Sequence, residues 1–222
     1  MAALAGTFPG SASAQVAFEA ALQSDYRLRG YSASNGHAVA SLSADYDDPS
    51  GAYAGGVVAG MLFDGDPYVL LLEGHAGYAV RIAPTISLDI GATHSQYYLG
   101  YGTSRNYQYS EAYVGIALPH VSARASYSPN YYFPHTPTLY AEVDGGVEPA
   151  PNWFLSAHAG ALFYLDGGPF GLPDKRYDWR VGVSRQLGKF GLHVELSGRL
   201  QGEYSPYAHD KAALAATLTR AF

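Results

Sequence analysis

The chain has 222 residues, no cysteine, 20 tyrosines, 26 glycines and a formal net charge of −6. Only 14% of its residues are charged, against roughly 25% in soluble domains, and no apolar stretch reaches the roughly 18 residues of a transmembrane helix. The lack of cysteine excludes a disulfide framework, a thiol nucleophile and a cysteine-ligated zinc site. The net negative charge argues against nucleic acid as a partner, because phosphate binding needs clustered lysine and arginine.

The N-terminal residues 1–14 are interpreted as the remainder of a signal peptide. Ala12-Ser13-Ala14 precedes Gln15, which is the small-x-small pattern of a signal peptidase site. The segment lacks a basic start and a full apolar core, so we expect its beginning to be truncated. Residues 15–222 are expected to form a single outer-membrane barrel, since no linker or change in composition divides them.

From Gln15 onward the sequence divides into segments of about 10 to 13 residues that alternate apolar and polar side chains and end at turn-forming residues. A period of two is typical of strands, and the length suits a strand that crosses a bilayer. Strands are predicted over residues 15–26, 37–47, 52–63, 68–81, 86–97, 107–118, 121–132, 137–147, 153–164, 176–187, 191–201 and 211–222.

Most segments have one apolar face and one polar face. Residues 107–118, for example, set Val114 against Glu111. The segment 52–63 is glycine-rich and apolar on both faces, so its own pattern orients it weakly. For this segment we assign Tyr53, Val57, Met61 and Phe63 to the lipid face.

The final segment, KAALAATLTRAF, decides the architecture. Alone it could be an alanine-rich helix, but the preceding segments share its period of two. A terminal strand with an apolar face and a final aromatic residue is what a closed membrane barrel needs to join its last strand to its first. We therefore interpret Phe222 as an assembly signal.

The connections support the same architecture. Those after the even-numbered strands are short, and most of the others are longer, as expected when an even number of strands returns both termini to the periplasmic side. We predict an all-β fold, a transmembrane antiparallel up-and-down barrel of 12 strands in the bacterial outer membrane. The soluble alternative, a β-sandwich or a lipocalin-like barrel, would point apolar residues inward and leave charged residues outside.

Projected inward, the polar face of the strands forms a lining of mixed charge. It consists of Glu73, His75, Arg81, Asp89, Glu111, Arg124, Glu142, Asp144, Asp178, Arg180, His193, Glu195 and Arg199. Two interpretations stay open: a pore lining that selects small polar solutes, or a salt-bridged plug. Twelve strands lie between the roughly 8 that fill their interior with side chains and the roughly 16 that leave a channel.

Two other groups stand near strand ends. Arg27 and Arg29 follow the first strand, where they would attract anions at the pore mouth, or instead pair with Asp25 or with lipid phosphates. Tyrosines close to the longer connections are predicted to form an interfacial aromatic girdle. They are Tyr97, Tyr98, Tyr101, Tyr107, Tyr109, Tyr131, Tyr132, Tyr204 and Tyr207.

No catalytic or metal site is expected, and no cofactor. The histidines on the strands show no recognisable spacing of zinc ligands. A lipid hydrolase would need serine and histidine together on the outer face. The His120-x-Ser122 pair falls at a predicted periplasmic turn, and the outward His94 is followed by Gln96, so we predict that the protein is not an enzyme.

Several segments resemble the TorF-type putative porin family of proteobacteria. The resemblance begins at Ser24-Asp25-Tyr26-Arg27-Leu28-Arg29-Gly30-Tyr31-Ser32 and returns at Glu111-Ala112-Tyr113-Val114-Gly115 and at Asp178-Trp179-Arg180-Val181-Gly182-Val183-Ser184. It covers most of residues 18–200. It implies an outer-membrane barrel that acts as a pore, without an established substrate.

The sequence thus predicts a porin-like channel for passive diffusion of small polar solutes or ions. Its expected partners are outer-membrane lipid, the barrel-assembly machinery and the solutes themselves. The alternatives are a structural or adhesive barrel without conductance and an outer-membrane lipid hydrolase.

Overall fold

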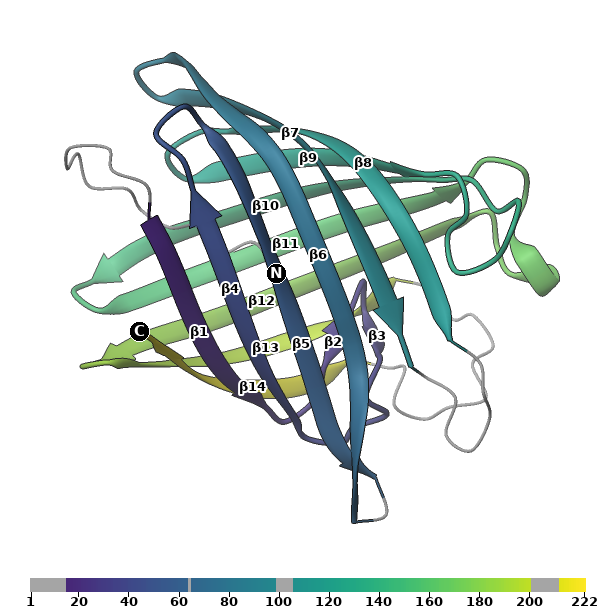
Figure 1. Ribbon diagram of the computed structural model, residues 1–222, viewed down its shortest axis with the longest axis horizontal. Helices are drawn as coiled ribbons and strands as arrows, with labels where there is room; N and C mark the ends of the chain where they lie inside the picture. The colour runs from purple at the N-terminus through teal and green to yellow at the C-terminus, as the bar shows by residue number, and fades with distance from the viewer. Residues whose placement is uncertain (1–14, 64, 99–105, 201–211) are drawn as a thin grey trace.

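The computed structural model describes residues 15–63, 65–98, 106–200 and 212–222, and these residues form a single β-barrel (Figure 1). Twelve of the described strands close an antiparallel ring in the order β1-β14-β13-β12-β11-β10-β9-β8-β7-β6-β5-β4. The predicted barrel of 12 strands is therefore confirmed. The predicted signal peptide, residues 1–14, lies outside the described residues. Within the described ranges, no helix is long and apolar enough to cross a bilayer.

The strands of the ring match the predicted segments closely. Their bounds are β1 (Gln15–Gln23), β4 (Val39–Asp47), β5 (Ala52–Phe63), β6 (Asp66–Ala83), β7 (Ile86–Tyr97), β8 (Tyr107–Ala117), β9 (Val121–Ser128), β10 (Thr138–Ala150), β11 (Trp153–Tyr164), β12 (Lys175–Leu187), β13 (Phe190–Leu200) and β14 (Ala213–Ala221). The two-residue strands β2 (Arg27–Leu28) and β3 (Tyr31–Ser32) and the 3-10 turn η1 (Pro169–Gly171) are not members of the ring.

The first and last strands close the barrel. They pair antiparallel from Glu19 opposite Ala221 to Gln23 opposite Thr217, and the backbone N–H of Phe222 donates to the Phe18 carbonyl at 3.0 Å. The C-terminal segment is thus a strand rather than a helix. Closure gives the backbone groups of both edge strands a partner, which a strand in a bilayer cannot obtain from water.

The two ends of the barrel differ. Figure 1 shows the start of β1 and the end of β14 at the end that carries the tight turns, which include the one from β10 to β11. The opposite end carries the connection from β1 to β4 and the one that contains η1. We call these the short-turn end and the loop end. The difference agrees with the predicted alternation of connection lengths.

The apolar side chains of the strands face outward. Exposed members of this face occur all around the ring and include Val16, Leu22, Leu42, Val58, Leu62, Leu72, Val80, Ile90, Val114, Val143, Leu155, Val181, Leu196 and Leu214. Because the exterior is apolar on every side, the interior must take the polar side chains of the same strands.

The predicted orientation of 52–63 is wrong. In β5 the exposed apolar side chains are Val58 and Leu62, whereas Met61 is buried and Tyr53 hydrogen-bonds to interior groups. The neighbouring strand sets this orientation, since its register places Val58 opposite the exposed Leu42. A strand that is apolar on both faces carries too little alternation to show this in its own sequence.

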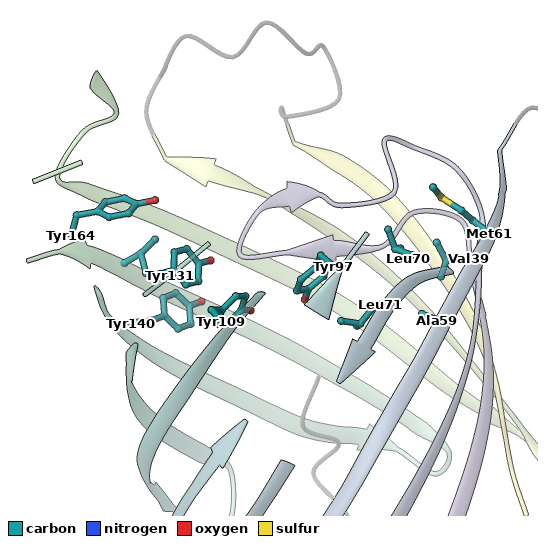
Figure 2. Packing of buried hydrophobic residues seen from close by; sticks show 11 residues of the cluster. Val39, Ala59, Met61, Leu70, Leu71, Tyr97, Tyr109, Tyr131, Tyr140 and Tyr164 are labelled. Atoms are coloured by element: carbon teal, nitrogen blue, oxygen red, sulfur yellow. The ribbon is translucent and has the colours of Figure 1, made fainter. Parts of the chain in front are cut away.

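The loop end of the interior is packed. A buried cluster joins aliphatic side chains of β4, β5 and β6 to a group of tyrosines (Figure 2). Its members are Val39, Ala59, Met61, Leu70, Leu71, Tyr97, Tyr109, Tyr131, Tyr140, Leu162 and Tyr164. A register shift between Ala59 and Gly60 leaves Leu70 without a partner in β5, and both Leu70 and Leu71 are buried.

The predicted tyrosine girdle is wrong for the members that are buried. Tyr97 is 0% exposed, and Tyr109 and Tyr131 are also buried in the interior cluster. Tyr97 lies on the same face of β7 as Asp89, and Tyr109 lies on the same face of β8 as Glu111. Because side chains alternate between the two faces of a strand, both tyrosines point inward. Three of the predicted girdle residues, Tyr101, Tyr204 and Tyr207, lie outside the described residues.

Two glycines make room for tyrosines on the inner wall. Gly77 and Gly91 pair with each other on β6 and β7, between Tyr53 of β5 and Tyr113 of β8. The two tyrosine hydroxyls hydrogen-bond to each other over these glycines. A Cβ atom added at Gly91 would contact the Tyr113 hydroxyl and lie 2.6 Å from the Ala76 carbonyl oxygen.

We predict that Gly91→Ala destabilises the barrel by about 1–3 kcal/mol, as expected when a well-packed site is overfilled. The matched control is Gly74→Ala, because a Cβ atom at Gly74 would have its nearest neighbour, the Gly55 carbonyl oxygen, at 3.9 Å. Urea unfolding of both variants in lipid vesicles measures the difference. Equal unfolding midpoints would contradict the packing described here.

Candidate functional site

The predicted lining residues all lie on the strand face opposite the exposed apolar side chains, which is the inner wall. By strand they are Glu73, His75 and Arg81 of β6, Asp89 of β7, Glu111 of β8, Arg124 of β9, Glu142 and Asp144 of β10, Asp178 and Arg180 of β12, and His193, Glu195 and Arg199 of β13. Their contacts divide the wall into clusters.

The first cluster lies on β5, β7, β8 and β9. The Tyr53 hydroxyl donates to Asp89 at 2.5 Å, and the Arg124 guanidinium donates to the other Asp89 oxygen at 3.2 Å. Arg124 also stacks on the Tyr113 ring, 4.2 Å from its centroid. The Asp89 carboxylate is thus held from both sides. Tyr113 lies on the same face of β8 as Glu111, so alternation alone would have placed it on the inner wall. Tyr53 was missed because the predicted orientation of its strand was wrong.

The second cluster centres on His158 of β11. Its Nδ1 lies 2.8 Å from Asp144, and its Nε2 lies 3.0 Å from Asp178. Arg180 donates to Asp144 at 3.2 Å, and the Tyr140 hydroxyl donates to Asp178 at 3.1 Å. An imidazole between two carboxylates can donate from both ring nitrogens when it is protonated. His158 was not among the predicted lining residues. It lies on the face of β11 opposite to that of the exposed Leu155, so the alternation of side chains points it inward.

The remaining lining residues make smaller contacts. Ser95 donates to Glu73 at 2.8 Å, and His75 lies 3.0 Å from Asp45. His193 contacts Ser184 at 2.8 Å and Glu195 at 3.3 Å. Arg199 stacks on Tyr31, Glu142 is half-buried, and Arg81 is exposed near the short-turn end.

Residues 24–38, which we call the lumen hairpin, include the predicted connection 27–36, in which Arg27 and Arg29 were expected at the pore mouth. They contain β2 and β3, paired through Arg27–Ser32 and Leu28–Tyr31. The turn at Arg29-Gly30 has positive φ at both residues, +48° and +78°, as in the tight turns that suit a two-residue hairpin. The Asp25 carboxylate accepts hydrogen bonds from Arg27, Ser32 and Ser34 at 3.0, 2.5 and 2.9 Å.

The tip of the lumen hairpin contacts the barrel wall. Arg29 donates from Nη2 to both oxygens of Glu111 at 2.8 Å, and its guanidinium stacks on Tyr140, 3.9 Å from the ring centroid. Gly30 packs against β13, where an added Cβ atom would lie 2.9 Å from the Gly198 carbonyl oxygen. The side chains of Arg27 and Arg29 are only 3% and 12% exposed, and their ion-pair partners are Asp25 and Glu111. Both cations are therefore paired within the protein.

A serine and a histidine meet on the outer face. His94 of β7 is directly opposite Ser110 of β8, and its Nδ1 lies 2.9 Å from the Ser110 hydroxyl. Both side chains are exposed and near the loop end. The pair joins two strands, so the spacing within one strand did not indicate it. Among the described residues, no third group is hydrogen-bonded to His94.

Within the described ranges, one group of three potential metal ligands has its ligand atoms within 4.8 Å of one another: Glu142, Asp144 and His158. These oxygens and nitrogens suit a divalent cation in chemical type. Arg180, however, lies 3.2 Å from both Asp144 and His158. Its positive charge opposes a cation there, and the ion-pair network accounts for the group.

Solved structures with a similar fold are porins. The NanC porin has a TM-score of 0.62 at 7% identity, with 94% of this chain and 99% of that chain covered. The KdgM porin has a TM-score of 0.57 at 9% identity, with 93% and 98% covered. At such low identity the likeness concerns the fold alone, which is a porin-like barrel. A comparison with curated protein sequences finds no significant match.

The sequence itself matches one family. Residues 8–197 fit the family described as "Bacterial protein of unknown function (Gcw_chp)". The match includes the lumen hairpin and nearly all of the predicted lining residues. Because it spans more than half of the chain, the protein belongs to this bacterial family.

Proposed function

We propose that the protein is a porin-like channel of the bacterial outer membrane for passive diffusion of small polar solutes or ions. One observation carries this proposal: a closed barrel with apolar side chains exposed all around its exterior has an inner wall of mixed charge. Part of this wall is open to water, since the side chains of Asp144 and Arg180 are 33% and 32% exposed.

The solute is small on this proposal, because side chains fill the loop end of the interior. The resemblance to TorF-type putative porins supports the same function. One solved neighbour is the KdgM porin in complex with disordered oligogalacturonate, at a TM-score of 0.56 and 10% identity, with 95% of this chain and 99% of that chain covered. Saccharides are therefore a solute class to include in transport assays, together with simple ions.

We predict steady single-channel currents when the purified, folded protein is reconstituted into planar bilayers. The mixed charges of the inner wall would replace part of the hydration of a passing ion. Protein denatured before reconstitution is the control. Reproducible silence of folded protein would favour the alternative, a structural or adhesive barrel without conductance.

A second candidate function is lipid hydrolysis on the outer face. The hydrogen bond between His94 and Ser110 supports it, because a nucleophile and a base must be within such reach. The pair stands where acyl esters of a bilayer would meet the barrel. The absence of an orienting group for His94 among the described residues makes this the weaker candidate.

If this second function exists, folded protein releases fatty acid from phospholipid or lipid A, and His94→Ala lowers the rate by about 100-fold or more, since general base catalysis contributes at least that much. Ser122→Ala, at the short-turn end, is the matched control. Hydrolysis that is absent, or that survives His94→Ala, excludes the pair as a catalytic site.

We also propose that Phe222 serves barrel assembly and contacts outer-membrane lipid. Its side chain is 69% exposed at the end of the closing strand, with Arg220 4.7 Å from its ring centroid. The partner on this proposal is the barrel-assembly machinery, reached after export by the signal peptide of residues 1–14.

Deletion of Phe222 is expected to reduce the heat-modifiable, folded protein recovered from the outer membrane, because it removes the terminal aromatic group and the last backbone hydrogen bond to β1. Phe222→Tyr is the control, since it keeps both. Normal recovery after deletion would refute the role in assembly.

A further inference from the structure

We infer that the lumen hairpin is the constriction of this channel, and that the Arg29–Glu111 ion pair at its tip determines the size and charge of the solutes that pass. This inference rests on the proposed channel function. It concerns an element for which the strand pattern of the sequence offers no signal.

The lumen hairpin is a defined structure. Three side chains converge on Asp25, and Arg27 also donates to the Gly30 carbonyl at 2.8 Å. Tyr26, Leu28 and Ala33 pack against the buried cluster of the loop end. A segment held by polar and apolar contacts together keeps one position in the lumen.

The hairpin crosses the interior. It begins after β1 and ends before β4, yet Arg29 reaches Glu111 on β8, which is separated from β4 by three strands of the ring. On another side Gly30 meets Gly198 and Arg199 of β13. An element in contact with β8, β10 and β13 at once divides the cross-section. A barrel of this size has little interior to spare.

The presence of an arginine at position 29 of the turn is explained by the ion pair with Glu111. Arg29 has a φ of +48°, a conformation that favours Gly, Asn or Asp over Arg. The turn geometry therefore gives no reason for arginine, whereas the two hydrogen bonds to Glu111 and the stacking on Tyr140 do. Arginine suits such a site because its planar fork binds a carboxylate through two hydrogen bonds and stacks on aromatic rings.

The pair is also balanced in charge. Both side chains are largely buried, at 12% and 8% exposed. Removal of either partner would leave the other charge uncompensated at the constriction. The two single substitutions should therefore change ion selectivity in opposite directions, which a merely structural contact would not do.

The test compares wild type with Arg29→Asn, Glu111→Gln and the double variant in planar bilayers, after a check that each protein is folded and heat-modifiable. Asn is favoured in this turn, so Arg29→Asn keeps the hairpin while it removes the ion pair. A fifth protein, in which a short Gly-Ser linker replaces residues 27–36, removes the hairpin. The matched control is Glu148→Gln, an exposed glutamate at the short-turn end of β10.

Removal of the hairpin is expected to raise single-channel conductance by about two-fold or more, because it frees much of a narrow cross-section. Arg29→Asn should shift the reversal potential toward cations, and Glu111→Gln should shift it toward anions. The double variant should return selectivity to the wild-type value. Glu148→Gln should change neither conductance nor selectivity.

The outcomes separate this inference from the channel function. A conducting wild type whose conductance and selectivity are unchanged in every hairpin variant overturns the inference and leaves the channel. If the wild-type protein carries no current but the hairpin variants do, the hairpin is the obstruction, and free diffusion through the intact protein is overturned. Silence of all the folded proteins overturns both.

Discussion

The structure depends on the need of every strand in a ring to have two hydrogen-bonded neighbours. The antiparallel pairing of β1 with β14 meets that need for the two strands that would otherwise be edges. Once the ring is closed, each strand has an outer and an inner face, and the alternation of side chains assigns every residue to one of them. The apolar exterior and the charged interior follow from closure together with the period of two.

The interior satisfies its charges by pairing them across strands. Asp89 lies between Tyr53 and Arg124, and His158 lies between Asp144 and Asp178. A charge removed from water is costly unless it is paired and hydrogen-bonded, so a narrow lumen favours mixed signs over a single sign. Part of this polar wall is open to water, since the side chains of Asp144 and Arg180 are 33% and 32% exposed.

The loop end of the interior is filled mainly by packed side chains. Tyrosines, aliphatic side chains and the lumen hairpin fill it as they would fill the core of a soluble domain. The barrel therefore combines a packed end with a polar wall, and the Arg29–Glu111 pair joins the hairpin to that wall. The outer face adds one polar contact between strands, His94 with Ser110. These features make transport through the interior and chemistry on the exterior separable by experiment.

The sequence by itself determined the number of strands, their approximate bounds and the inward parity of all the predicted lining residues, because these depend on a local period of two. It did not determine the orientation of β5, since a strand apolar on both faces is oriented by its neighbour. Nor did it indicate the inward course of the lumen hairpin or the contact of Arg29 with Glu111, 82 residues away. Such contacts depend on strand register and on how the closed ring fills its interior, and only the tertiary structure decides both.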